Sequence, residues 1–175
     1  MLRRLAARDP ERYPLLLDSA AEGPLSQRSR LLAAPSAALW LDRTGRLGAQ
    51  GLTPQGEGFL AALENWWRSE RLSGTDGEGT EPLSAGGWAI FLGYELAGEI
   101  EPHLALPRTP LPWQAFALRT HGAIELDLRT GRIRAAAEDS RTLARLLADA
   151  LQAAAEADRS DSLTIARVRE EDPRA

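Results

Sequence analysis

The chain has 175 residues, of which 43% are hydrophobic and 26% are charged, and its formal net charge is −4. These values are those of one ordinary folded domain, so they argue against a disordered chain and against a basic nucleic-acid-binding protein. The sequence contains no cysteine and no run of about 18 apolar residues, which excludes disulfides, thiolate zinc sites and a membrane-spanning helix. Charged residues interrupt any apolar signal core at the N-terminus, so we expect a cytoplasmic protein.

Three segments have the spacing of apolar residues that marks an amphipathic helix. The first is short, places Leu2 and Leu5 on one face, and ends before Pro10. The second spans residues 57–71, and the third begins at Ser140, which can cap it. The faces expected to be buried contain Phe59, Leu60, Leu63, Trp66 and Trp67 in the second helix and Leu143, Leu146, Leu147, Ala150, Leu151 and Ala154 in the third.

Strands are expected between these helices. The continuous apolar run within residues 14–21 predicts a strand that is buried on both faces. Gly45 and Gly131 lie where a tight hairpin needs positive φ. Further strands are predicted at residues 29–34, 37–43, 88–96, 114–120, 123–128 and 132–137. The predicted fold class is therefore α+β, with largely antiparallel sheets and two main flanking helices.

Two segments have the composition of connections. Residues 73–87 are rich in glycine, serine, threonine and acidic residues and have no apolar period, which predicts a flexible loop. Residues 159–175 are polar and have the composition of a linker. The sequence thus predicts one domain at residues 1–158, followed by a linker.

Common catalytic motifs are missing from the sequence. There is no lysine, and this excludes a P-loop. Neither His103 nor His121 has a second ligand or base at helical or loop spacing, so spacing indicates no histidine triad or metal site, and both are interpreted as surface or hairpin residues. Acidic residues cluster at Glu99 and Glu101 and again at Glu170, Glu171 and Asp172, and the second cluster, in a polar tail, is interpreted as solvated charge.

Two segments together resemble a known family. The segment Gly86-Gly87-Trp88, continuing to Gly93-Tyr94-Glu95, resembles the Gly-Gly-Trp...Gly-Tyr-Glu segment of aminodeoxychorismate synthase component I. The related anthranilate synthase component I usually has Gly-Tyr-Asp there. Residues 12–19 are similar to the Leu-Leu-Glu-Ser strand near the start of the same family, and the later strands, hairpin and helix follow in the family's order.

The resemblance implies that residues 1–158 are the N-terminal domain of such a protein and form part of a β-sandwich. Residues 159–175 would then be the linker toward a chorismate-binding catalytic domain that lies outside this chain. In the family that domain holds the catalytic residues and the magnesium ligands. The resemblance therefore implies no catalytic residue, no cofactor and no metal site in this chain.

One ligand site is also implied by the resemblance. In the family, the serine of the Leu-Leu-Glu-Ser strand lines a tryptophan pocket, and Ser19 is the matching position. Arg28, on the strand that follows, is the second candidate ligand-binding residue. A serine near a strand end also bonds commonly to local backbone, so a structural role for Ser19 is the alternative.

The expected function is that of a non-catalytic scaffold for the chorismate-binding domain in para-aminobenzoate and folate biosynthesis. The parent family uses chorismate and glutamine-derived ammonia, and this chain alone is expected to be inactive. Two alternatives remain open: a tryptophan-binding regulatory module of the anthranilate synthase type, or a docking module for a glutamine amidotransferase subunit. Neither nucleic acid nor a membrane is an expected partner.

Overall fold

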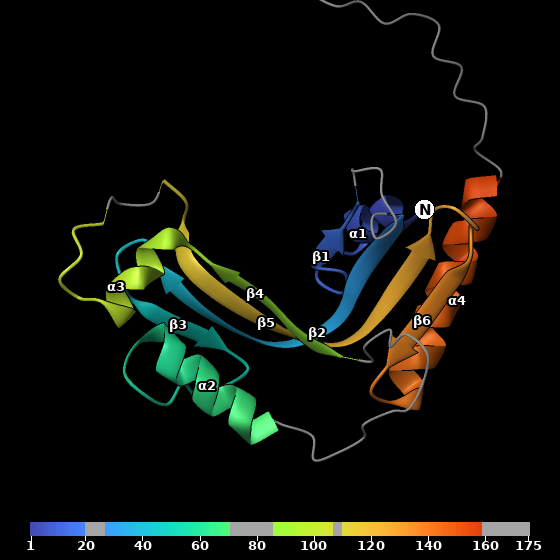
Figure 1. The fold of residues 1–175 in the computed structure, drawn as a ribbon. Coiled ribbons are helices and arrows are strands. Elements are labelled where there is room, and N and C mark those ends of the chain that lie inside the picture. The colour runs from blue at the N-terminus through green and yellow to red at the C-terminus, as the bar shows by residue number, and fades with distance from the viewer. Residues whose placement is uncertain (20–26, 71–85, 107–109, 159–175) are drawn as a thin grey trace, which may run out of the picture.

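The computed structural model describes residues 1–19, 27–70, 86–106 and 110–158. These residues form one six-stranded antiparallel sheet with helices packed on it, which confirms the predicted α+β class (Figure 1). In chain order the elements are α1 (Leu2–Arg8), β1 (Leu15–Leu17), β2 (Arg28–Asp42), β3 (Leu47–Gln50), α2 (Gly58–Glu70), β4 (Gly87–Leu92), a 3₁₀ turn (Tyr94–Leu96), α3 (Ala97–Ile100), β5 (Trp113–Asp127), β6 (Ile133–Ala137) and α4 (Ser140–Asp158).

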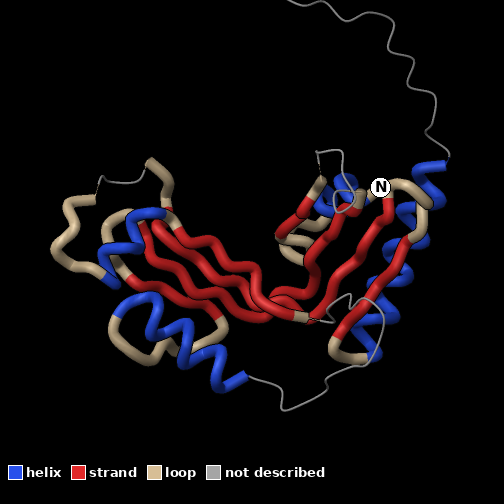
Figure 2. The backbone as a smooth tube through the Cα atoms, in the orientation of Figure 1, coloured by secondary structure: helices blue, strands red, loops and turns tan. Residues whose placement is uncertain are grey.

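Two long strands, β2 and β5, pair along their whole length and run through both halves of the sheet. One half has the order β3-β2-β5-β4, and the other has the order β1-β2-β5-β6. Figure 2 shows the strands as one bent band, with α2 beside one half and α4 beside the other. The two predicted hairpins are confirmed, because Gly45 (φ 84°) joins β2 to β3 and Gly131 (φ 69°) joins β5 to β6.

A bulge in β2 marks the junction of the two halves. Pro35 lies opposite Thr120 and Ala37 lies opposite Arg119, so Ser36 is the extra residue. Because an extra residue shifts the side-chain alternation by one, the buried residues of β2 point to one side of the sheet before the bulge, as Leu31 does, and to the other side after it, as Leu39 does. The prediction of two separate strands around Pro35-Ser36 was wrong, since a proline at a bulge does not end a strand.

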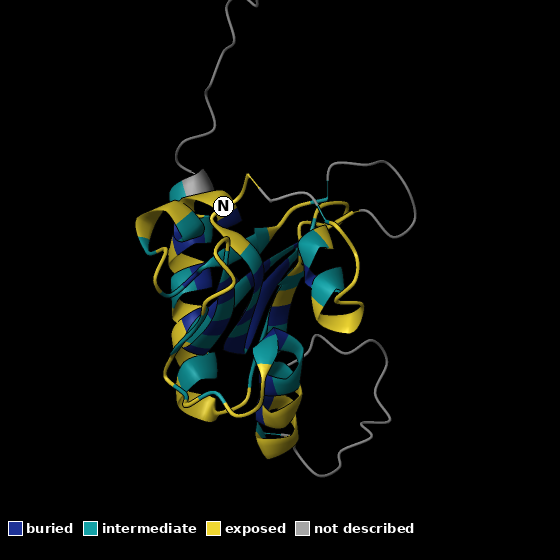
Figure 3. Cartoon of the chain, turned by 90° about the vertical axis from the view of Figure 1, so that its left-hand side faces the viewer, coloured by how far each residue is buried: buried dark blue, intermediate teal, exposed yellow. Residues whose placement is uncertain are grey.

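The helices cover opposite faces of β5. Ala115 and Ala117 point into a core with Phe59 and Trp66 of α2, whereas Ile124 points into a second core with Leu146 of α4. Side chains alternate along a strand, so odd and even residues of β5 face different sides. Figure 3 shows buried residues along the middle of the sheet and exposed residues on the outer sides of the helices. Among the described residues, each half therefore has one face without a helix.

Several strand predictions need correction. The first strand was expected to be buried on both faces, but β1 has three residues at the edge of the sheet and Leu17 is 51% exposed. Residues 114–120 and 123–128 belong to one strand, β5, because hydrogen bonds to β2 and β6 keep it continuous through Gly122. The strand predicted at 88–96 ends at Leu92, where the chain turns into 3₁₀ and α-helical geometry.

The helix predictions are confirmed in position but not in every buried residue. Helix α4 buries Leu146, Ala150 and Ala153, whereas Leu147 and Leu151 are exposed, and Trp67 of α2 is 43% exposed. The residue that caps α4 is Asp139, not Ser140. One carboxylate oxygen of Asp139 accepts a hydrogen bond from the Thr142 N–H at 2.8 Å.

Two predictions fall on other parts of the chain. Most of the flexible loop predicted at 73–87 and the whole linker predicted at 159–175 lie outside the described residues. None of the described helices is long and apolar enough to cross a membrane.

Candidate functional site

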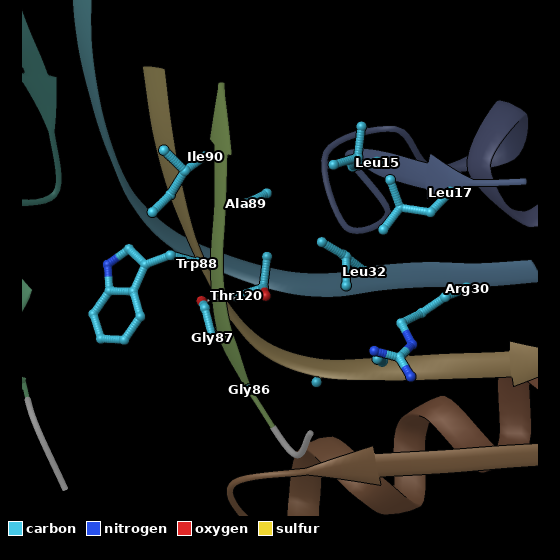
Figure 4. A pocket seen from close by; sticks show the side chains of 12 residues that line it. Leu15, Leu17, Arg30, Leu32, Gly86, Gly87, Trp88, Ala89, Ile90 and Thr120 are labelled. Atoms are coloured by element: carbon cyan, nitrogen blue, oxygen red, sulfur yellow. Dashed lines mark hydrogen bonds between the residues drawn. The ribbon is translucent and has the colours of Figure 1, made fainter. Parts of the chain in front are cut away.

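A groove of about 310 Å³ lies where the two halves of the sheet meet. Figure 4 shows Leu15, Leu17 and Leu32 on one side of it and Ala89 and Ile90 on the other. The groove therefore contains residues from both segments that carry the sequence resemblance, although about 70 residues separate them. Its lining consists of Leu15, Leu17, Arg30, Leu32, Gly86, Gly87, Trp88, Ala89, Ile90, Thr120, Gly122 and Ala123.

Two glycines let β4 come close to its neighbours. A Cβ atom on Gly86 would lie 2.0 Å from Oε1 of Glu138 and 2.9 Å from the carbonyl oxygen of Thr120. At the other end of β4, the Gly93 N–H donates to the carbonyl oxygen of Gln114 at 2.7 Å, and a Cβ there would lie 2.5 Å from the same oxygen. The glycines of the Gly-Gly-Trp...Gly-Tyr-Glu segment thus meet a packing requirement at both ends of the strand.

A buried arginine packs against Trp88, one of the residues that line the groove. The side chain of Arg119 is 4% exposed, and its guanidinium lies 4.5 Å from the centre of the Trp88 ring. Its Nε donates to Glu70 of α2 at 2.7 Å, and its Nη2 donates to Glu138 at 2.6 Å. Arg119 therefore ties α2, β4 and the start of α4 together, and its buried charge is fully paired.

The charge of Glu138 is stabilised by this arrangement. Burial alone would raise the pKa of Glu138, but the hydrogen bonds from Arg119 and His121 outweigh burial and hold the pKa below its usual value. By contrast, the indole Nε1 of Trp88 is buried and has no hydrogen-bond acceptor among the described residues. A buried donor without an acceptor is uncommon in folded proteins and is a place where a ligand or partner can add one.

A second ion cluster lies beside the groove on the face without a helix. Glu125 is 1% exposed, and its two carboxylate oxygens accept hydrogen bonds from Arg30 and Arg134 on the neighbouring strands. Burial raises the pKa of Glu125. The hydrogen bonds from Arg30 and Arg134 lower the pKa by more than burial raises it, so the pKa lies below its usual value. With two arginines to one carboxylate, this cluster leaves one net positive charge at the rim of an apolar groove.

The two candidate ligand residues lie near the end of the pairing between β1 and β2. β1 ends at Leu17, which pairs with Arg30, so Ser19 follows the strand by two residues, and Arg28 begins β2 opposite Asp127 of β5. Neither residue lines the groove itself. Whether they bind a ligand stays a prediction.

The structure gives His121 contacts that sequence spacing did not reveal. Its Nε2 lies 2.8 Å from the Ser36 hydroxyl, and its Nδ1 contacts Glu138. These partners are 85 and 17 residues away along the chain, so only strand pairing brings them together. His103 is exposed and lies 3.8 Å from Glu101. In the described ranges, no group of three or more His, Cys, Asp or Glu residues is placed to hold a metal ion.

No protein-family model matches the sequence, and no curated protein sequence matches it. The fold, however, is similar to that of a crystal structure of anthranilate synthase component I from Streptococcus pneumoniae. The likeness has a TM-score of 0.54 and 15% sequence identity, and it covers 77% of this chain and 31% of the other. The chain thus has a fold found in anthranilate synthase component I, and it spans less than a third of that protein's length.

Proposed function

We propose that this chain is the N-terminal domain of a chorismate-using synthase, of the aminodeoxychorismate synthase component I type, that it is non-catalytic in the chorismate reaction, and that it supports a separate chorismate-binding domain. The observation that carries the proposal is the meeting of the two family-like segments, from β1 and β4, in one groove. The similarity in fold to anthranilate synthase component I supports the broader part of the proposal, a relation to chorismate-using synthases, independently of those segments.

The exposed apolar surface supports a scaffold role. On the face of β2 and β5 that points away from α2, Trp40, Trp113 and Phe116 line a hollow of about 450 Å³, and Trp113 is 47% exposed. Ile90, Leu92, Tyr94 and Ile100 are also exposed, but none of them lines this hollow. An exposed apolar hollow on a small domain is typical of a site of contact with another protein or domain.

An assay of the chain with chorismate, magnesium and ammonia tests whether the chain alone can convert chorismate. We expect neither aminodeoxychorismate nor anthranilate above the rate without protein, because none of the groove residues is arranged to transfer an amino group to chorismate. Formation of either product in proportion to the protein concentration would refute the proposal, and the product formed would identify the pathway.

A second candidate function is the binding of tryptophan or a similar amino acid. It is favoured by Ser19, two residues after β1, and Arg28, at the start of the neighbouring strand β2, because a hydroxyl and a guanidinium can bond to an amino acid's polar groups. Calorimetric titration with tryptophan tests it, with a Ser19→Ala, Arg28→Ala double variant as control. Binding heat and a raised melting temperature in the unaltered chain alone would support it, and their absence would exclude it.

A further inference from the structure

Three polar side chains at the junction of the sheet halves form a continuous hydrogen-bonded chain. The Ser36 hydroxyl lies 2.8 Å from Nε2 of His121, and Nδ1 of the same ring contacts Oε2 of Glu138. The other oxygen of Glu138 accepts a hydrogen bond from the buried Arg119 at 2.6 Å. The three residues come from the β2 bulge, from the middle of β5, and from the turn between β6 and α4.

This is the arrangement that activates a serine nucleophile. A carboxylate bonded to Nδ1 selects the tautomer with its proton on that atom, which leaves Nε2 as an acceptor for the serine proton. Glu138 is suited to this role because Arg119 fixes its position and because its pKa is held below the usual range, so that it stays charged. Ser36 is exposed, and the His121 side chain is 33% exposed, so a substrate can reach both reacting atoms.

We propose that Ser36, His121 and Glu138 form a hydrolytic triad that acts on small carboxylic esters. Oγ of Ser36 attacks the ester carbonyl carbon while Nε2 of His121 takes the hydroxyl proton. Collapse of the tetrahedral adduct breaks the bond to the alcohol, which leaves with the proton from Nε2, and an acyl-serine remains. Water then attacks the acyl-serine with His121 again as base, and this step releases the acid and restores the serine.

The surroundings of Ser36 favour a small uncharged substrate. Ser36 borders a hollow of about 470 Å³, a volume within the usual range for small-molecule sites. Pro10, Pro14, Pro35 and Leu118 supply apolar surface, and Glu11 is the one charged residue among the described residues that line it. The carboxylate of Glu11 disfavours anionic esters. The proposed activity requires neither chorismate nor a second domain, so its failure leaves the proposed scaffold function untouched.

Covalent labelling with a fluorophosphonate, followed by peptide mass spectrometry, tests the nucleophile. The expected result is one adduct on Ser36 that is absent from the Ser36→Ala variant and at least about 100-fold slower in His121→Asn. Ser69→Ala is the matched control, because the Ser69 hydroxyl donates to the Trp66 carbonyl oxygen and has no histidine beside it. A chain that is folded by circular dichroism but gains no adduct at Ser36 would overturn the proposal.

Hydrolysis of p-nitrophenyl acetate provides the second measurement. Ser36→Ala should lower kcat/KM at least about 100-fold, and an unchanged rate in that variant would overturn the proposal. Glu138 is a positioning residue, so Glu138→Gln should lower kcat with KM unchanged, and Glu138→Asp should recover part of the loss. A purely structural role for Glu138 would instead lower the melting temperature of both variants without this pattern in kcat.

Discussion

At the scale of single residues, Arg119 shows how a charge can be buried at the junction of two packing units. Its guanidinium contacts two carboxylates, the Trp88 ring and the carbonyl oxygen of Thr120, so its donors are satisfied on all sides. A lysine at this position could not make all of these contacts, because an ammonium group is a compact charge without the planar set of donors of a guanidinium. The geometry explains why an arginine lies in the middle of β5, next to Leu118.

Replacing Arg119 should destabilise the protein strongly. Arg119→Met removes the partner of two partly buried carboxylates, so we expect the free energy of unfolding to fall by about 3 kcal/mol. Arg68→Met, on the exposed face of α2, is the control and should change it by less than about 0.5 kcal/mol. Urea unfolding of both variants measures the difference. Equal effects in the two variants would contradict the assigned role of Arg119.

Glu125 predicts a specific loss of stability in acid. Because its pKa is lowered in the folded protein, its charged form stabilises the fold above the ordinary value of 4.5, and this contribution is lost as the pH falls through the lower folded value. Glu125→Gln should cost about 2 kcal/mol at neutral pH but should flatten the stability curve below pH 4.5. Denaturant unfolding across this range tests the claim, and parallel curves for the two proteins would refute it.

At the scale of elements, sequence patterns predicted local structure well and strand continuity poorly. The hairpins could be predicted because their turns need a positive φ, which glycine adopts readily. Helix α2 could be predicted because its apolar residues recur every three to four positions. The continuity of β2 through Pro35 could not be predicted, because the bulge depends on pairing with β5 far along the chain. Similarly, Leu147 and Leu151 fit the apolar period of α4 but face away from the sheet.

Gly87 and Gly93, which lie near opposite ends of β4, differ in the space around them. Gly93→Ala would force a Cβ into the Gln114 carbonyl oxygen, so we expect a loss of about 2 kcal/mol in unfolding free energy. Gly87→Ala, six residues earlier, would meet no atom within 4 Å and should be close to neutral. Both positions lack positive φ, so the comparison isolates packing from backbone strain. Thermal unfolding measures the stability of both variants. A larger loss of stability in Gly87→Ala than in Gly93→Ala would contradict the assigned role of Gly93.

At the scale of the whole molecule, the bent sheet places the helices on opposite faces of its two halves and leaves apolar surface uncovered. The sequence predicted the fold class and both segments of the groove. It could not predict the ion clusters around Arg119 and Glu125, or the contacts of His121, because their members are far apart along the chain. Those clusters follow from the register of β2, β5 and β6, which no short-range pattern encodes.

The exposed apolar surface around Trp113 is the expected binding site for a partner domain. If a partner domain covers it, Trp113→Asp should weaken the complex at least about tenfold while leaving the fold of the isolated chain intact, because the side chain is half exposed there. Leu151→Asp, on the outer side of α4, is the matched control and should not affect association. Equal loss of binding in both variants would show that the Trp113 face is not the interface.

The central claim, that this chain is a scaffold for a chorismate-binding domain, is tested most directly by calorimetric titration with that domain, produced separately from the same organism. We expect saturable binding with a one-to-one stoichiometry, and we expect the partner domain to convert chorismate faster when the complex forms. Absence of both binding heat and co-elution, with the two proteins folded, would contradict it.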